Sequence, residues 1–288
     1  MLLEKYQEQF EKKLRSFVQE LGDASPLHEA CSYALLSQGK RLRPLLVVSI
    51  AEALGYGLDV TPAALSVECF HTASLIADDL PSMDDDDFRR NRPSLHKQFG
   101  ESTALLASYT LIAEGYGGIS RNEELMRQKC PQKASQAAFL ALQTATRCGG
   151  LQGATYGQYL DLFPPDISWK TASQIIAQKT ISLFQLSFVF GWLFGGGDAN
   201  QLEVVEKCAW HFGMAFQLAD DWEDELQDKK REQTVNAINL LGREETERLF
   251  QKELDGLENS LKVLGLWIQP LQEICCILRS KTAPLRAL

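Results

Sequence analysis

Two clusters of aspartates, each closing an apolar segment with helical periodicity, constrain this chain more than any other feature of its sequence. The first cluster places six aspartates within residues 78–87, directly after the apolar run from Val67 to Ile76. Pro81 cannot lie inside a helix without removing a backbone hydrogen bond, so we expect the helix to end there and the chain to fold back. That reversal would bring Asp84 back to the end of the helix.

The second cluster is an Asp-Asp-x-x-Asp motif at residues 220–224, which closes the apolar run from Ala209 to Ala219. On a helix, Asp220 and Asp224 lie one turn apart on the same face, and their repulsion is destabilising unless a cation compensates it. Carboxylate oxygens in this number suit Mg²⁺. A solvated acidic loop is the alternative for either cluster alone, but the two together favour one shared metal site. Its predicted ligands are Asp78, Asp79, Asp84, Asp220, Asp221 and Asp224.

The remainder of the chain predicts an all-α fold. Almost every segment has the spacing of apolar side chains that is typical of helices, and we find no convincing alternating strand. No linker or low-complexity tract divides the sequence, so we expect residues 1–288 to form a single-domain helical bundle around a deep central cavity. The expected helices cover residues 3–21, 27–37, 45–54, the long segment that leads to the first aspartates, and about 102–116, 132–148, 149–162, 171–195, 201–225, 236–241, 243–263 and 267–280.

Composition argues against several classes of function. The net charge of −9, with no basic stripe to offset it, argues against a nucleic-acid partner. The seven cysteines lack Cys-x-x-Cys spacing, which favours reduced core residues of a cytoplasmic protein over disulfides or a zinc site. The N-terminus does not resemble a signal peptide, and the longest apolar stretch, residues 181–194, is too short to span a bilayer. We therefore expect a cytoplasmic protein with no transmembrane segment.

Several cationic residues are candidates for binding phosphate. The segment from Gly39 to Pro44 places three cations in four residues before an apolar helix, which suits phosphate oxygens; a solvated basic turn is the alternative. Lys179 lies beside Thr180 in an apolar segment, where a lysine is unusual unless its charge meets an anion. Arg89 and Arg90 directly follow the first aspartates, so they could also be local salt-bridge partners.

Two polar features on helices point toward the same region. His71 lies two turns before Asp78 on the same helical face, although a lone helical histidine is usually structural. Gln158 and Asp161 lie close to four glycines between residues 149 and 157. This pattern indicates helices that approach closely and aim polar groups inward.

Taken in order, the motifs resemble those of the trans-isoprenyl diphosphate synthases. The chain contains Gly-Lys-Arg-x-Arg-Pro, Asp-Asp-x-x-x-x-Asp followed by Arg-Arg, His-Lys-x-Phe-Gly-Glu from His96 to Glu101, Lys-Thr, and Phe-Gln-x-x-Asp-Asp-x-x-Asp. The similarity covers roughly residues 27–242 and is greatest to the bacterial farnesyl and geranylgeranyl diphosphate synthases, whose first aspartate motif has the same two-residue insertion. It implies an all-α fold, a homodimer, and condensation of isopentenyl diphosphate with an allylic diphosphate (dimethylallyl, geranyl or farnesyl).

The same resemblance implies a role for each motif residue. Three Mg²⁺ ions would be held with the allylic diphosphate between the two aspartate motifs. The implied catalytic residues are Asp78, Asp79, Asp84, Arg89, Lys179, Asp220 and Asp221. The implied contacts to the allylic diphosphate come from Arg89, Lys179 and Gln217, and those to isopentenyl diphosphate from Lys40, Arg43, His71 and Arg90. Thr180 is a further implied substrate-binding residue. Cations of this kind neutralise a diphosphate leaving group, and an apolar cavity protects the resulting carbocation from water.

The chain also departs from the family pattern. The departures are Ala77 for a histidine, Ser108-Tyr109 for Gly-Asp, Tyr156 for a glycine, and a shortened loop over residues 225–233 with Glu232 where a lysine is usual. We predict that Lys229 or Lys230 takes over the phosphate contact of that missing lysine. A weakly active or regulatory homologue is one alternative. A terpene cyclase is another, which the second aspartate motif and the basic pocket disfavour.

Product length is predicted from the helix before Asp78. A growing tail would pass Ala73 and Ser74, which lie five and four residues earlier and about one turn deeper. Farnesyl-forming relatives often have a bulky aromatic residue at the fifth position back. Because Ala73 is small, we expect geranylgeranyl diphosphate as the main product. Farnesyl diphosphate is the alternative, with Phe70 or Tyr109 as the floor of the cavity.

Overall fold

The structure, a computed structural model, describes residues 2–231 and 236–281, and the side chains of these residues except 223–231 and 281. Its helices are α1 (Leu2–Gln19), α2 (Pro26–Leu35), α3 (Leu42–Leu54), α4 (Thr61–Asp78), α5 (Leu95–Phe99), α6 (Glu101–Lys129), α7 (Pro131–Gly149), α8 (Ala154–Leu162), α9 (Trp169–Ile175), the π-helix η1 (Ile176–Ile181), α10 (Ser182–Phe194), the 3₁₀-helix η2 (Ala199–Gln201), α11 (Leu202–Arg231), α12 (Ala237–Leu241), α13 (Arg243–Val263) and α14 (Gln269–Lys281). Two short strands, β1 (Phe88–Arg89) and β2 (Arg92–Pro93), pair as an antiparallel hairpin. The predicted all-α fold is therefore confirmed; that residues 1–288 form one domain stays a prediction.

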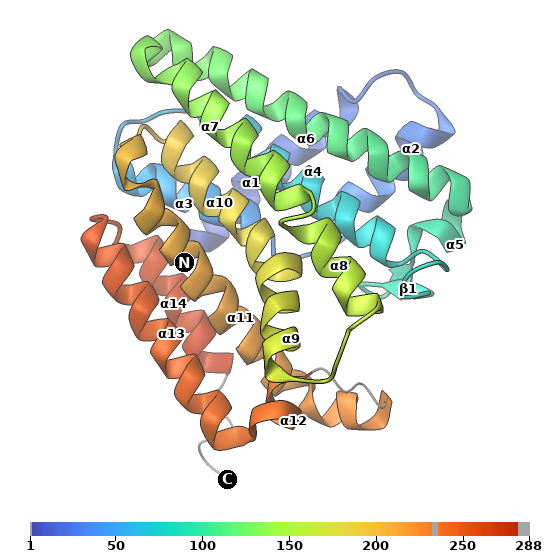
Figure 1. Ribbon diagram of the computed structural model, residues 1–288. Coiled ribbons are helices and arrows are strands. Elements are labelled where there is room, and N and C mark those ends of the chain that lie inside the picture. Colours follow the sequence, from blue (N-terminus) through green and yellow to red (C-terminus); the bar gives the residue numbers. More distant parts are fainter. Residues whose placement is uncertain (1, 232–235, 282–288) are drawn as a thin grey trace.

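Helix α10 lies at the centre of the bundle and packs against α3, α4, α7 and α11 (Figure 1). Every residue of α10 except Gln185 is buried, as expected for a helix that is apolar on all sides. Close packing against α3 depends on Gly191, because a Cβ atom there would lie 2.8 Å from the carbonyl oxygen of Val47.

Aromatic side chains fill the space between α10 and α11. The ring of Phe184 lies 4.9 Å from that of Phe212 and 5.1 Å from that of Phe216. Such pairs stabilise a core beyond the area that they bury. The packing fixes the face of α11 that continues directly into Gln217 and the second aspartate motif.

Helices α6 and α7 lie along one another on the outer side of the bundle, where α6 also covers α4 (Figure 1). Helices α11, α13 and α14 gather on the opposite side. No helix within the described residues has the length and apolar character that a membrane-spanning helix needs.

The largest errors in the predicted boundaries concern three segments. Helix α6 continues to Lys129, well beyond residue 116. The helix expected over residues 171–195 is divided, because six residues from Ile176 to Ile181 form a π-helix between α9 and α10. Such irregular turns are frequent at functional sites.

The third error concerns the segment after the second aspartate motif. Residues 225–231 were expected to begin a loop, but α11 continues to Arg231. Glutamate, leucine, glutamine, lysine and arginine are strong helix formers, and they make up most of this segment. Helix propensity therefore accounts for the continuation of α11 to Arg231.

Candidate active site

The first aspartate motif folds back as the sequence predicts. Helix α4 ends at Asp78, and the backbone N–H of Asp84 donates to the carbonyl oxygen of Asp78 at 2.9 Å. A tight turn before it is closed by the N–H of Met83, which donates to the carbonyl oxygen of Leu80 at 2.9 Å. The reversal at Pro81 thus brings the backbone of Asp84 into contact with the helix end.

The surroundings of Asp78 disfavour its negative charge. Burial raises its pKa to about 6; Lys179 opposes this rise, and the negative charge of Asp84 adds to it. A buried carboxylate with a raised pKa is one that a divalent cation would stabilise. Asp78 and Asp84 therefore fit as oxygen ligands for Mg²⁺.

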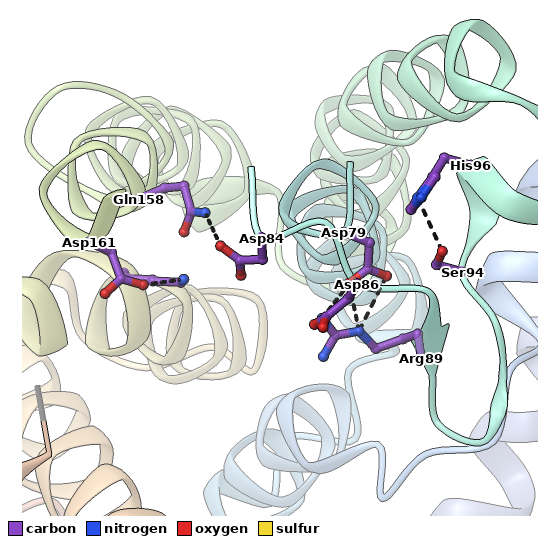
Figure 2. A network of polar contacts seen from close by, with 9 residues as sticks. Asp79, Asp84, Asp86, Arg89, Ser94, His96, Gln158 and Asp161 are labelled. Carbon is purple, nitrogen blue, oxygen red and sulfur yellow. Dashed lines mark hydrogen bonds and ion pairs between the residues drawn. The ribbon is translucent and has the colours of Figure 1, made fainter. Parts of the chain in front are cut away.

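Asp79 is paired with Arg89 (Figure 2). Its carboxylate accepts from Nε of Arg89 at 2.9 Å and also contacts Nη2, while Asp86 lies 3.3 Å from the same guanidinium. Burial raises the pKa of Asp79, and the hydrogen bond from Arg89 opposes that rise. Arg89 is thus a local salt-bridge partner in this structure, one of the two roles that the sequence allowed.

Helix α8 supplies two polar side chains, one of which contacts the first motif and the other Lys179 (Figure 2). Gln158 donates from Nε2 to Oδ1 of Asp84 at 3.4 Å, and Asp161 accepts from Nζ of Lys179 at 2.6 Å. Burial lowers the pKa of Lys179, but attraction from Asp78 and Asp161 outweighs it and the net pKa is raised. Lys179 is therefore a cation surrounded by carboxylates. This agrees with the expectation that a lysine in an apolar segment has an anionic partner.

Close approach of α8 and η1 makes this arrangement possible. A Cβ atom at Gly157 would lie only 2.3 Å from the backbone nitrogen of Lys179, so no other residue fits there without moving the backbone. The predicted close approach at the glycines is thereby confirmed for Gly157, and it aims Gln158 and Asp161 inward.

The second aspartate motif is tied to α12 and η1. Asp221 is 9% exposed and accepts from Nε2 of Gln217 at 2.8 Å and from the backbone N–H of Ala237 at 2.8 Å. Gln217 in turn accepts from the hydroxyl of Thr180 at 3.1 Å. A carboxylate that receives an N–H at the first turn of α12 acts as a helix cap. Asp221 thus has a structural role that sequence reasoning missed.

Fewer contacts are described for the remaining predicted residues of this region. Asp220 is partly buried, and its negative charge opposes the lowering of the Arg43 pKa that burial causes. The side chains of Asp224, Lys229 and Lys230 lie outside the described residues, although α11 passes through all three positions. The predicted phosphate role of the two lysines stays a prediction.

A cationic cluster is formed by Arg43 in the first turn of α3, His71 within α4 and Arg90 in the turn of the hairpin. Nη1 of Arg43 donates to Nε2 of His71 at 3.2 Å, and the guanidinium lies 4.2 Å from the centroid of the Phe184 ring. Burial lowers the pKa of Arg43 to about 10. Burial also lowers the pKa of His71 well below its usual value, and Arg43 and Arg90 lower it further.

The cationic cluster is short of hydrogen-bond acceptors. Within the described residues, Nε of Arg43 and Nδ1 of His71 are buried without a partner. Nη1 of Arg90 donates to the hydroxyl of Ser37 at 3.3 Å. Buried donors without acceptors cost free energy that an anion would recover. The cluster therefore suits an anionic ligand such as a phosphate.

Arg41, which belongs to the same basic segment, is a structural residue. It donates to Glu11 and to the carbonyl oxygens of Leu35 and Ser37, and it forms an ion pair with buried Glu68. The sequence showed three cations in this segment, but it did not show that all hydrogen-bond donor atoms of one of them, Arg41, are directed at groups of the protein itself. No local signal could have separated them, because the partners come from distant segments.

Lys40 is exposed at the edge of a cavity of about 630 Å³ that Phe216 and Gly39 also line. Gly39 leaves room for Arg90 here, because a Cβ atom would lie 2.6 Å from Nη1 of Arg90 and would displace the end of that side chain. The predicted set Lys40, Arg43, His71 and Arg90 is thus brought to one region, with Lys40 at its outer edge.

The chain-length positions lie where α4 packs on α6. Ala73 is 1% exposed, and its carbonyl oxygen accepts from the hydroxyl of Ser108 at 3.0 Å. The Phe70 ring sits over Gly115, where a Cβ atom would lie 2.6 Å from it. Tyr109 is 59% exposed, so within one chain it does not close a cavity as the sequence had allowed.

Comparison with known proteins identifies relatives over most of the chain. Residues 24–236 match the family profile described as "Polyprenyl synthetase". The farnesyl diphosphate synthase of Geobacillus stearothermophilus is 36% identical over 214 residues, which is 73% of this chain and 70% of that protein. The large subunit 2 of the heterodimeric geranylgeranyl pyrophosphate synthase of Arabidopsis thaliana is 33% identical over 276 residues, 93% of this chain and 70% of that protein. The crystal structure of a geranyltransferase from Legionella pneumophila matches with a TM-score of 0.84 at 28% identity, covering 98% of this chain and 97% of that one.

Proposed function

Since the chain belongs to the polyprenyl synthetase family and is a short-chain trans-prenyltransferase, we propose that it extends an allylic diphosphate with isopentenyl diphosphate and that its main product is geranylgeranyl diphosphate. The observation that supports two diphosphate sites is the pairing of a carboxylate-rich region around Asp78 with a cationic cluster that lacks acceptors. A diphosphate can bind directly to the cationic cluster, and it can bind to the carboxylate-rich region through metal cations.

Mg²⁺ is the proposed cofactor of the first region. Asp78 and Asp84 would hold it from one side and Asp220 from the other, with up to three ions present once diphosphate is bound. When bound, Mg²⁺ neutralises the charge of the departing diphosphate. The raised pKa of Asp78 supports this, because the carboxylate is destabilised until a cation arrives.

The protein's own groups assist departure of the diphosphate. Lys179 keeps its charge in a buried position because carboxylates surround it, so it can donate to the oxygens of the leaving group. Arg89 is held beside the first motif by Asp79 and can donate to the same leaving group. No general base of the protein is needed for ionisation itself.

Arg43, His71 and Arg90 are the proposed site for isopentenyl diphosphate. The low pKa of His71 keeps the imidazole neutral, so it can serve as an acceptor for Arg43 while Nδ1 stays available to the ligand. The ring of Phe184 beneath Arg43 begins the apolar core. A charged head group would therefore bind above an apolar interior that excludes water from the reacting carbons.

Product length is the finer part of the proposal. The small side chain of Ala73 supports a longer tail than an aromatic residue would allow, and Phe70 lies one turn deeper. Relatives of both product classes match at similar identity, so farnesyl diphosphate is the alternative product.

The assembly and location are also proposals. A stripe of exposed apolar side chains on α6 and α7 supports a homodimer: it consists of Leu105, Leu106, Tyr109, Ile112, Phe139 and Leu142. All seven cysteines, each within the described residues, are free, which supports a reducing compartment such as the cytoplasm. The net charge of −9 continues to argue against a nucleic-acid partner.

The test is product analysis with purified chain, Mg²⁺, dimethylallyl diphosphate and excess isopentenyl diphosphate. We expect geranylgeranyl diphosphate to accumulate, and we expect Ala73→Tyr to shorten the product while ionisation continues. Accumulation of farnesyl diphosphate by the unmodified chain would show that the floor of the cavity lies elsewhere, while absence of any condensation would reject the proposed substrates.

A further inference from the structure

The loop between the first aspartate motif and the hairpin holds a second group of metal-ligating side chains. One ligand atom from each of Asp85, Asp87 and His96 lies within 4.8 Å of the others. None of these three belongs to the predicted diphosphate site. The backbone brings them together because the N–H of Ser94 donates to the carbonyl oxygen of Asp87 at 2.9 Å, which extends the hairpin toward His96.

The histidine is the observation that distinguishes this group from an ordinary acidic loop. His96 is 6% exposed, and its Nε2 atom is buried without a hydrogen-bond partner in the described part of the chain. Its Nδ1 atom is 3.1 Å from the hydroxyl of Ser94 (Figure 2). When the Nδ1–H donates to that hydroxyl, Nε2 presents a lone pair. A histidine oriented in this way by an oxygen partner is typical of metal ligands.

The neighbouring charges separate this group from the diphosphate site. Asp79 and Asp86, which lie in the same stretch of sequence, are engaged by Arg89 (Figure 2). Asp87 instead forms an ion pair with Lys97 at 2.7 Å, in which both side chains are largely exposed. An exposed lysine is a replaceable counter-charge, because such pairs contribute little to stability.

We propose that Asp85, Asp87 and His96 bind one divalent transition-metal cation, at a site separate from the Mg²⁺ that accompanies diphosphate. Two carboxylates with one imidazole suit Zn²⁺, Mn²⁺ or Co²⁺, whereas Mg²⁺ prefers oxygen ligands alone. The cation would replace Lys97 beside Asp87. It would link the loop that follows Asp84 to α5, and so hold the segment that carries Asp84 and Arg89.

The test measures Zn²⁺ binding by titration calorimetry in the absence of diphosphate, so its outcome does not depend on the proposed prenyltransferase activity. Excess Mg²⁺ is present to occupy the other aspartates. Cys276 is an exposed thiol, so every protein in the series also has Cys276→Ser. We expect one Zn²⁺ per chain, and binding at least ~10-fold weaker in both His96→Gln and Asp85→Asn.

Two matched variants make the result specific. Asp86→Asn removes the same charge from the same loop, but its carboxylate contacts Arg89, so we expect Zn²⁺ affinity within about 2-fold of the parent. Lys97→Gln removes the competing cation and should strengthen binding. Absence of Zn²⁺ binding in the parent would overturn the proposal, and so would equal weakening by Asp86→Asn and Asp85→Asn, which would indicate only a diffuse negative field.

Cobalt gives an independent readout of the histidine. With Co²⁺ in place of Zn²⁺, visible absorption reports the ligands directly, and His96→Gln should change the spectrum while Asp86→Asn leaves it unchanged. An identical spectrum in the parent and His96→Gln would show that no imidazole is bound and would reject the site.

Discussion

Arg41 and Arg43 lie two residues apart in one basic segment, yet their surroundings are opposite. Arg41 is 4% exposed and meets two carboxylates and two backbone carbonyls. Arg43 meets a histidine and an aromatic ring, and within the described residues its Nε has no partner. Burial lowers the pKa of Arg43, whereas the carboxylates of Glu68 and Glu11 raise that of Arg41 in spite of burial.

The comparison separates residues that stabilise the fold from residues whose charge is fully compensated only when a ligand binds. A buried charge that the protein neutralises is costly to disrupt, because removing either partner leaves the other uncompensated. A buried charge that the protein leaves under-satisfied lowers stability until an anion binds. The same contrast exists between two carboxylates of α4, since Glu68 is paired with Arg41 whereas burial raises the pKa of Asp78.

The largest expected effect follows from breaking the neutralised cluster. Arg41→Met would leave Glu68 buried without its cation, so the free energy of unfolding should fall by about 3–5 kcal/mol. Urea denaturation measures this. The double variant Arg41→Met/Glu68→Gln should recover part of the loss, because the unpaired charge is gone. Unchanged stability in the single variant would mean that Arg41 is no more structural than Arg43.

Substituting the neighbouring arginine should give the opposite pattern. Arg43→Met should lower kcat/KM for isopentenyl diphosphate by at least ~10²-fold, the scale for losing a charged partner of a diphosphate. Its free energy of unfolding should be unchanged or higher, because an under-satisfied buried cation has been removed. Steady-state kinetics and denaturation on the same preparation test both parts. If Arg43→Met is destabilised as much as Arg41→Met but retains the kcat/KM of the parent, the proposed difference between the two arginines is wrong.

The carboxylate pair gives a pH-dependent version of the same comparison. The folded-state pKa of Asp78 is about 6, above its ordinary value of 3.8, so the folded chain binds more protons than the unfolded chain between these pH values. Stability contributed by protonated Asp78 is therefore lost as pH rises from about 4 to about 6.

Asp78→Asn should remove this loss. Without metal or diphosphate, it should be more stable than the parent by about 1–2 kcal/mol above pH 6, less than the ~3 kcal/mol of the full shift because Asp78 is partly exposed. Near pH 4 the two proteins should be equally stable. Denaturation curves across this range test the sign, and Glu68→Gln, which breaks an ion pair, should instead be destabilised. A difference for Asp78→Asn that does not vary with pH would contradict the raised pKa.

The smallest expected effect concerns the glycine beneath the cationic cluster. In Gly39→Ala, the new Cβ would displace the end of the flexible Arg90 side chain, which lies 2.6 Å from its position. We expect KM for isopentenyl diphosphate to rise roughly 10-fold, the scale of one charge-assisted hydrogen bond, with little change in stability. A KM equal to that of the parent would place Arg90 outside the substrate site.

Much of the arrangement follows from local sequence. Apolar periodicity predicts the helices, and Pro81 alone predicts the reversal that brings Asp84 back to Asp78. The glycines around Gly157 predict the close approach that aims Gln158 and Asp161 at the site. The family resemblance adds the reaction class. The comparisons confirm that the chain belongs to the polyprenyl synthetase family.

The sequence by itself determined which residue types are available and on which helix faces they lie, because helical periodicity and the conformational limits of proline and glycine act over a few residues. Only the tertiary structure decided which charges are neutralised. Arg41 finds Glu11 and Glu68 at separations of 30 and 27 residues, whereas Arg43, two positions later, finds His71. The π-helix that presents Lys179, which packs against α8 and α11, and the burial of Nε2 of His96 were equally hidden in the sequence. Desolvation and pairing are properties of the folded surroundings, so identical side chains acquire different roles.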